Sequence, residues 1–143
     1  MANIFLSYSR VDSERAEELF EKLTQALRSE KGVHVWSDRE IEPGSNWMEA
    51  IEHELERATT FILVLSPAYL NSNYAAFEIG VAMARCSLGE AQVIQLLVAD
   101  INADDLPPLL RHRTLIDARG KSAEQAARLV TDLVQRSPRE RRA

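Results

Sequence analysis

The sequence of 143 residues contains a single cysteine, Cys86, which rules out an internal disulfide and any metal site built from several cysteines. Its three histidines do not stand at the spacing from one another that a metal site needs. The five glycines are isolated, so they form neither a GxxxxGK nor a GxGxxG phosphate loop, and no GxSxG motif occurs. We therefore expect no bound metal, and no nucleotide-binding or nucleophile site of the kinds that these motifs form.

Long apolar runs and a leader segment are also missing. The apolar run at residues 61–65 is far shorter than the ~20 residues that a membrane span needs. The first residues enter an apolar segment without the basic stretch that begins a signal peptide. Together with the lone cysteine, these features predict a soluble, cytoplasmic protein.

The charge is unevenly distributed along the chain. Seventeen basic and 22 acidic residues give a net charge of −5, but residues 136–143 contain four arginines and one glutamate. The remaining chain is therefore acidic and offers no basic face for nonspecific binding to nucleic acid or anionic lipid. We expect one domain over residues 1–136 and a basic tail or the start of a linker over 137–143.

Short apolar segments alternate with amphipathic ones, which is typical of an α/β fold with a mostly parallel sheet. Strands are expected at residues 4–8, 33–36, 61–65, 93–98 and 115–116. Helices are expected from residue 12 or 13 to about 31, from 47 to about 58, from about 72 to 88, and over 122–135. Segment 100–113 contains two adjacent prolines and is not expected to form a regular helix at its centre.

Ligands of open parallel sheets bind at the carboxyl ends of the strands, so polar residues after each strand are the candidates for a site. They are Ser7–Arg10 after the first strand, Ser37 and Asp38 after the second, and the segment from Ser66 to Glu78 after the third. On pattern alone, Glu78 is most simply a solvated glutamate near a helix N-terminus. Its small neighbours, Ala75, Ala76 and Ala82, would leave room for a ligand beside it.

Three elements of the sequence together resemble a TIR domain of the bacterial type. They are the opening segment IFLSYS at residues 4–9, the Asp38-x5-Gly44 loop, and the motif Ser66-Pro67-x4-Ser72-x-Tyr74-x3-Glu78. The resemblance spans roughly residues 1–136. Tyr74 stands where the family usually has tryptophan, and Ala75 where it has cysteine, but neither change removes the acidic residue.

The resemblance implies a flavodoxin-like, three-layer α/β sandwich, with a five-stranded parallel sheet in the order 2-1-3-4-5 and helices on both faces. It also implies that the loop after the second strand, known in the family as the BB loop, mediates contacts between TIR domains. In this sequence the loop comprises Arg39, Glu40, Ile41, Glu42, Pro43, Gly44, Ser45, Asn46 and Trp47.

Many TIR domains cleave NAD⁺ between nicotinamide and ribose, so the resemblance implies an NAD⁺ hydrolase or ADP-ribosyl cyclase with no cofactor besides its substrate. It places the catalytic glutamate at Glu78. One carboxylate suffices, because nicotinamide leaves a cationic ring as a neutral molecule and needs no general acid. The residues expected to contact the substrate are Tyr8, Ser9, Arg10, Trp36, Asp38, Ser66, Ser72 and Tyr74.

The expected partners are NAD⁺, other TIR domains in a homo-oligomer or filament, and a sensor domain or partner subunit, but neither nucleic acid nor a membrane. The expected role is the effector of a bacterial anti-phage defence or immune signalling system. The main alternative is a non-enzymatic TIR–TIR adaptor, which includes a virulence factor that interferes with host signalling.

A nucleoside deoxyribosyltransferase-like enzyme would share the topology and a glutamate, but the BB-loop pattern argues against it. A phospho-acceptor receiver domain would need an acidic cluster after the first strand, where Ser7, Tyr8 and Ser9 stand instead.

Overall fold

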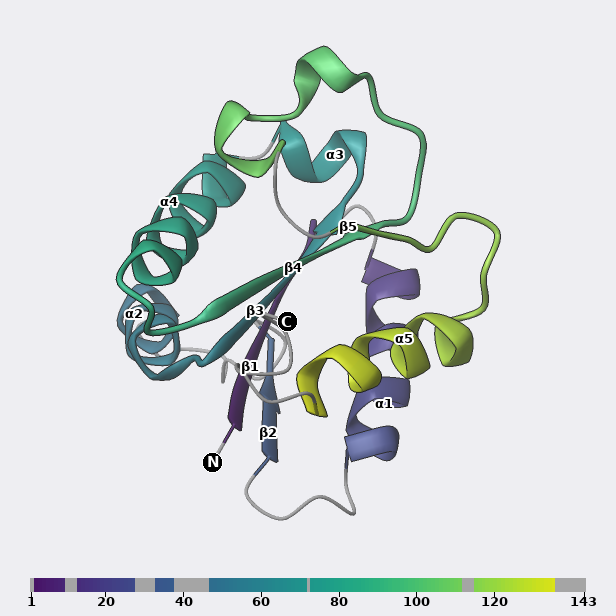
Figure 1. The fold of residues 1–143 in the computed structure, drawn as a ribbon, viewed down its shortest axis with the longest axis horizontal. Coiled ribbons are helices and arrows are strands. Elements are labelled where there is room, and N and C mark those ends of the chain that lie inside the picture. Colours follow the sequence, from purple (N-terminus) through teal and green to yellow (C-terminus); the bar gives the residue numbers. More distant parts are fainter. Residues whose placement is uncertain are drawn as a thin grey trace.

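Five parallel strands form a single sheet at the centre of the computed structural model, which describes residues 2–9, 13–27, 33–37, 47–71, 73–111 and 115–135. The strands are β1 (Ala2–Ser7), β2 (Val33–Trp36), β3 (Thr60–Leu65), β4 (Gln92–Leu97) and β5 (Leu115–Asp117). Their order in the sheet is 2-1-3-4-5, and every pair of neighbours runs parallel (Figure 1). The expected fold class and strand order are thus confirmed.

Four helices connect or follow these strands as the sequence predicts. They are α1 (Ser13–Leu27), α2 (Trp47–Arg57), α4 (Asn73–Ser87) and α5 (Ala123–Gln135). A short helix that the sequence analysis did not predict, α3 (Pro67–Leu70), directly follows β3. Two 3₁₀ turns, η3 (Ala103–Asp105) and η4 (Pro108–Leu110), lie in the segment where no regular helix was expected. The predicted tail, 137–143, lies outside the described residues.

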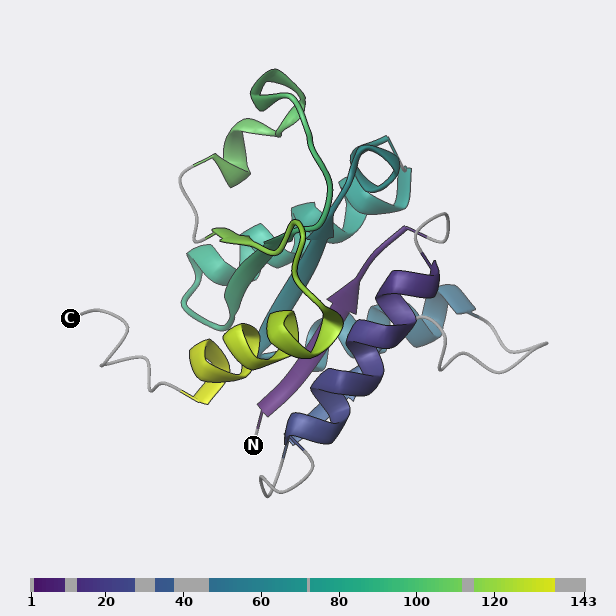
Figure 2. The ribbon, with the colours of Figure 1, turned by 90° about the vertical axis from the view of Figure 1, so that its right-hand side faces the viewer.

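The helices cover both faces of the sheet, with α1 and α5 on one face and α2 and α4 on the other (Figures 1 and 2). Successive side chains of a strand point to opposite faces. In β1, Ile4 and Leu6 belong to the core that includes α1 and α5, whereas Phe5 belongs to the core that includes α2 and α4. The result is three layers with two hydrophobic cores.

The apolar run of β3 lacks polar alternation because of its central position in the sheet. All six of its residues are buried, because helices cover both of its faces and β1 and β4 flank it. By contrast, β5 forms an edge of the sheet, and its terminal residues Leu115 and Asp117 are exposed. Because the strands are parallel, their carboxyl ends lie at the same end of the sheet, and α3 directly follows the end of β3.

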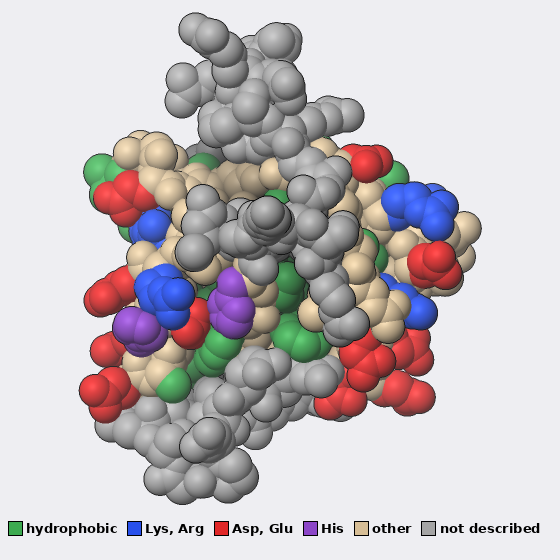
Figure 3. All heavy atoms as spheres, turned by 90° about the horizontal axis from the view of Figure 1, so that it is seen from below, with side chains coloured by type: hydrophobic (Ala, Val, Ile, Leu, Met, Phe, Trp, Pro, Cys, Tyr) green, Lys and Arg blue, Asp and Glu red, His purple; other side chains and the backbone are tan. Residues whose placement is uncertain are grey.

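Acidic side chains dominate much of the described surface. Figure 3, a view from below that of Figure 1, shows them along both sides of the molecule. Exposed glutamates occur on α1 at Glu14, Glu17, Glu18 and Glu21, and on α2 at Glu49, Glu52 and Glu56. The helices on both sides of the sheet thus contribute to the net negative charge.

Candidate active site

Three serines mark the carboxyl ends of adjacent strands. Ser7 is the last residue of β1, Ser37 follows β2, and Ser66 follows β3. Their exposed fractions are 2%, 0% and 2%, respectively. Because β1 lies between β2 and β3, these small polar side chains lie side by side at the end of the sheet where open parallel sheets bind ligands, on its β2 side.

Glu78 is buried at this edge. It lies in the second turn of α4 and is 8% exposed, so it does not extend into bulk solvent. Its Oε2 atom accepts a hydrogen bond from the hydroxyl of Ser7, which lies 71 positions earlier in the chain. The sheet edge and α4 therefore hold the candidate carboxylate between them.

Tyr69 completes a buried polar cluster with Ser7 and Glu78. The hydroxyl oxygens of Tyr69 and Ser7 lie 2.6 Å apart, and Tyr69 is 1% exposed. Burial raises the pKa of Tyr69 well above its ordinary value, because a buried phenolate loses its hydration. The negative charge of Glu78 raises that pKa further, and the hydrogen bond with Ser7 opposes the increase in part. Tyr69 is therefore a neutral phenol at physiological pH.

Helix α3 positions Tyr69. The Ser66 hydroxyl oxygen caps the helix by accepting a hydrogen bond from the backbone N–H of Tyr69 at 3.1 Å. Pro67 follows in the first helical turn, where its lack of an N–H group costs nothing. Ser66, predicted to contact the substrate, thus has a structural role, and its contact with a substrate stays a prediction.

Two of the other described residues that were expected to contact the substrate, Trp36 and Tyr8, pack in or against the two cores. Trp36 is 7% exposed, and its ring centroid lies 5.0 Å from that of Phe5, in the core on the side of α2 and α4. Tyr8 is half-buried and packs against the core on the side of α1 and α5. Ser9 is buried. Of the residues after the first strand, the structure brings Ser7 into contact with Glu78.

Several predicted residues lie outside the described part of the structure. They are Arg10, Asp38, Ser72 and the BB-loop residues Arg39 to Asn46. Trp47, the last residue of that predicted loop, is the first residue of α2, and Tyr74 belongs to α4, but neither side chain is described. Their roles stay predictions.

Two of the three alanines that were expected to leave space beside Glu78 are buried. Ala75 and Ala82 are 1% and 0% exposed and belong to the core between α4 and the sheet. Ala76 is exposed. Space for a ligand beside Glu78 stays a prediction.

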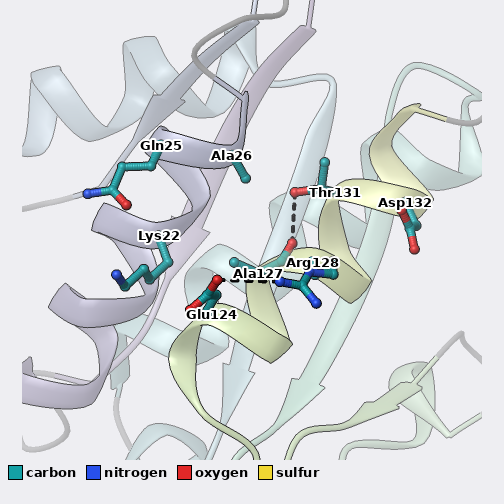
Figure 4. A pocket seen from close by; sticks show the side chains of 8 residues that line it. All are labelled: Lys22, Gln25, Ala26, Glu124, Ala127, Arg128, Thr131 and Asp132. Carbon is teal, nitrogen blue, oxygen red and sulfur yellow. Dashed lines mark hydrogen bonds and ion pairs between the residues drawn. The ribbon is translucent and has the colours of Figure 1, made fainter.

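Two pockets lined by described residues lie elsewhere. One, of about 290 Å³, lies between α1 and α5 and is lined by Lys22, Gln25, Ala26, Glu124, Ala127, Arg128, Thr131 and Asp132 (Figure 4). The other, of about 340 Å³, is lined by Pro67, Leu70 and Asn71 and by Asp100, Ile101, Asn102 and Asp105. Neither pocket is lined by Glu78. Among the described residues, the candidate site consists of the buried cluster of Ser7, Tyr69 and Glu78.

Among the described residues, no group of three or more histidine, cysteine, aspartate or glutamate side chains could hold a metal ion. Within the same part of the chain, no helix combines the length and the apolar character needed to cross a membrane.

The sequence analysis placed Ser7 and the segment that contains Tyr69 at the expected site, but it gave neither residue a role. Ser66 followed by Pro67 is a helix-start signal, an N-cap serine with proline at the first helical position, and it could have predicted α3. The contact between Ser7 and Glu78 had no such local signal, because it joins residues that are distant in the chain.

The described geometry suits one kind of chemistry. A carboxylate with little exposure interacts strongly with a positive charge, since little water screens it. The hydroxyl of Ser7 holds that carboxylate at the sheet edge before any ligand arrives. Such a preorganised anion can stabilise a cation that develops during a reaction.

Comparisons with known proteins agree with the fold. The sequence model of the TIR domain family matches residues 4–131. The 2′ cyclic ADP-D-ribose synthase BtTIR of Bacteroides thetaiotaomicron is 26% identical over 95 residues, which are 66% of this chain and 32% of that protein. The chain thus spans about a third of the length of this curated relative.

Solved structures share the architecture. The TIR domain of the Toll-related receptor TRR-2 from Hydra magnipapillata superposes with a TM-score of 0.64 at 20% identity, covering 92% of this chain and 94% of that one. A metazoan TIR-STING receptor from C. gigas gives a TM-score of 0.66 at 24% identity, covering 87% of this chain and 38% of that one. At these identities the likeness concerns the fold.

Proposed function

The chain belongs to the TIR domain family, and on that premise we propose that it cleaves the bond between nicotinamide and ribose in NAD⁺, with Glu78 as the catalytic carboxylate. The observation that supports this proposal best is the buried position of Glu78 at the carboxyl edge of the sheet, where Ser7 holds it. The similarity to a relative named as a cyclic ADP-ribose synthase supports the same substrate class.

In the proposed reaction, the C1′–N bond breaks and both of its electrons stay with the ring nitrogen. The positively charged pyridinium thereby leaves as neutral nicotinamide, so no side chain has to protonate it. The ribose carbon is left with oxocarbenium character. Glu78 stabilises that cation electrostatically and accepts hydrogen bonds from the ribose hydroxyls. NAD⁺ is a substrate in this scheme, and no metal or further cofactor takes part.

The capture of the ribose cation completes the reaction. Attack by water forms a bond from oxygen to C1′, releases a proton and yields ADP-ribose. Attack by a nucleophile within the same molecule, such as the adenine base, yields a cyclic product instead. We propose an NAD⁺ nucleosidase that acts as hydrolase or cyclase, and product analysis distinguishes the two.

Activity is proposed to depend on self-assembly through the loop 39–47, as the resemblance implies, with other TIR domains as partners and NAD⁺ as the substrate. In that setting, a sensor domain or partner subunit would bring copies together. Depletion of NAD⁺ by the clustered protein would serve as the effector step of a bacterial anti-phage defence. A TIR domain that acted purely as an adaptor would bind other TIR domains without consuming NAD⁺.

The proposal is tested by incubating the protein with NAD⁺, both dilute and clustered on beads, and measuring nicotinamide release by chromatography. Glu78→Gln keeps the shape of the side chain and removes its charge, so turnover by the clustered protein should fall at least about a hundredfold. Glu52→Gln, which neutralises an exposed glutamate of α2, is the matched control and should retain full turnover. Mass spectrometry of the second product identifies hydrolysis or cyclisation.

The possible outcomes discriminate between the proposals. Equal turnover by the wild-type protein and Glu78→Gln would show that the carboxylate has been assigned to the wrong residue. No turnover by the clustered wild-type protein would favour the non-enzymatic adaptor.

A further inference from the structure

We propose that Ser7 and Tyr69 are positioning residues for Glu78, and that the hydrogen-bonded chain from Tyr69 through Ser7 to Glu78 holds the carboxylate in one orientation at the sheet edge. This inference rests on the proposed function, because it gives both residues a part in the same reaction. Neither residue is assigned to the substrate.

The hydrogens in this chain can be placed by counting donors. Ser7 has one hydroxyl hydrogen, which it donates to Oε2 of Glu78. The Ser7 and Tyr69 oxygens lie 2.6 Å apart, so the hydrogen between them must come from Tyr69. Tyr69 retains that hydrogen because its burial and the charge of Glu78 raise its pKa. Both bonds therefore point toward the carboxylate.

Each donor is attached to a fixed element of the fold. Ser7 ends β1 and pairs with Leu63 of the fully buried strand β3. Tyr69 is held by α3, which Ser66 caps. Consequently, the two donors come from β1 and α3, whereas the acceptor Glu78 comes from α4.

Burial makes these hydrogen bonds effective. Ser7, Tyr69 and Glu78 are 2%, 1% and 8% exposed, so water competes little for them. A hydrogen bond to an ionised acceptor is stronger than one between neutral groups, and a donor that is itself polarised by a second donor is stronger still. The Ser7 bond restricts rotation of the carboxylate, and the Tyr69 bond prevents the Ser7 hydroxyl from turning away.

A loss of this restraint should reduce the rate of the reaction more than the binding of substrate. Hydrogen bonds that orient the side chains of metal sites contribute about 10- to 100-fold to metal affinity or activity, and we expect a similar factor for a catalytic carboxylate. Small displacements of reacting groups can be as costly. We therefore expect Ser7→Ala to lower kcat for nicotinamide release by at least about tenfold, while KM changes by less than about threefold. Ser7→Thr, which retains a hydroxyl, should recover most of the lost kcat.

Tyr69→Phe tests the second bond and keeps the volume of the ring. It should lower kcat by a smaller factor than Ser7→Ala does. Because Tyr69 acts through Ser7, the double variant should be no slower than Ser7→Ala alone. Thr131→Val is the matched control, since it removes a buried hydroxyl of α5 that bonds to the backbone of Ala127, and it should leave kcat unchanged.

The assay uses the full chain, clustered on beads, with circular dichroism to confirm that each variant is folded. If Ser7→Ala fails to fold, Tyr69→Phe and Ser7→Thr still decide the question through their kcat values relative to the wild-type protein. Wild-type kcat in both Ser7→Ala and Tyr69→Phe would overturn the inference. The inference would also be overturned if the double variant lost kcat by the product of the two single factors, because Tyr69 would then not act through Ser7.

Glu78→Gln separates this inference from the proposed function. If Glu78→Gln is inactive while Ser7→Ala and Tyr69→Phe match the wild-type protein, the positioning role fails and the proposed function stands. If Glu78→Gln is as active as the wild-type protein, the assignment of Glu78 fails, and the positioning role fails with it.

Discussion

The guanidinium group of Arg85 donates a hydrogen bond of 2.7 Å to the backbone carbonyl of Leu55, so that a side chain of α4 binds the end of α2. The same group donates to the carbonyl of Ala58 and lies over the ring of Phe61, 5.8 Å from its centroid. The last carbonyls of a helix have no partners within the helix, and a cation beside them also interacts favourably with the helix dipole. Arg85 thus joins α2, α4 and β3.

Replacing Arg85 should destabilise the fold more than the loss of a surface charge would. Arg85→Met keeps an apolar stem but removes the donors to Leu55 and Ala58, and the side chain is 16% exposed. A buried acceptor left without a donor costs about 1–3 kcal/mol, and the lost contact with Phe61 adds roughly 0.5–1 kcal/mol. We expect the free energy of unfolding, measured in urea at pH 7, to fall by about 2–4 kcal/mol.

Arg128→Met is the matched control for this experiment. Arg128 forms an ion pair of 3.3 Å with Glu124 on α5, and both side chains are largely exposed. Exposed pairs of this spacing contribute about 0.3–0.5 kcal/mol. Equal losses in the two variants would contradict the structural role that we assign to Arg85.

Replacing a glycine of α4 and a glycine of the turn after it by alanine should change the free energy of unfolding in opposite directions. Gly80 is exposed within the helix, and a Cβ atom there would meet nothing within 4 Å. Gly80→Ala should therefore raise the free energy of unfolding by about 0.5–1 kcal/mol. Gly89 has φ +74°, a left-handed conformation, so Gly89→Ala should lower it by roughly 1–2 kcal/mol. Urea unfolding of both variants measures the difference, and changes of the same sign would contradict this account.

Local pattern was sufficient to predict most of the fold. The apolar runs at 61–65 and 93–98 correspond to β3 and β4, because a strand covered on both faces needs no polar alternation. The strand order came from the resemblance to a family rather than from periodicity. Helix α3 was missed, because four residues are too few to show a helical period.

The candidate site was predictable in its position but not in its contacts. Glu78 looked like a solvated glutamate by spacing alone. Its place after the third strand made it a candidate, and the family motif added the catalytic role. Glu78 bonds to Ser7, and Ser7 bonds to Tyr69, and both partners belong to other elements of the fold. Contacts across such distances in the chain depend on the topology of the sheet, which periodicity does not reveal.

Tyr69 should make the protein sensitive to alkaline pH. The phenol of an unfolded chain has a pKa of about 10, and in the folded protein the pKa of Tyr69 is raised by burial and by the charge of Glu78. Below pH 10, both states keep the proton, and Tyr69 adds no pH dependence. Above pH 10, the unfolded state loses the proton while the folded state keeps it, so the stability due to Tyr69 falls as the pH rises.

Tyr69→Phe isolates this effect, because the other titrating groups are common to both proteins. The difference in unfolding free energy, wild type minus Tyr69→Phe, should be constant from pH 7 to about pH 9.5. It should then decrease by up to about 1.4 kcal/mol for each further pH unit. Urea unfolding curves at pH 7, 8, 9.5, 10.5 and 11 measure it. A difference that stays constant through pH 11 would show that Tyr69 ionises in the folded protein as readily as in the unfolded chain, which its burial beside an anionic Glu78 does not permit.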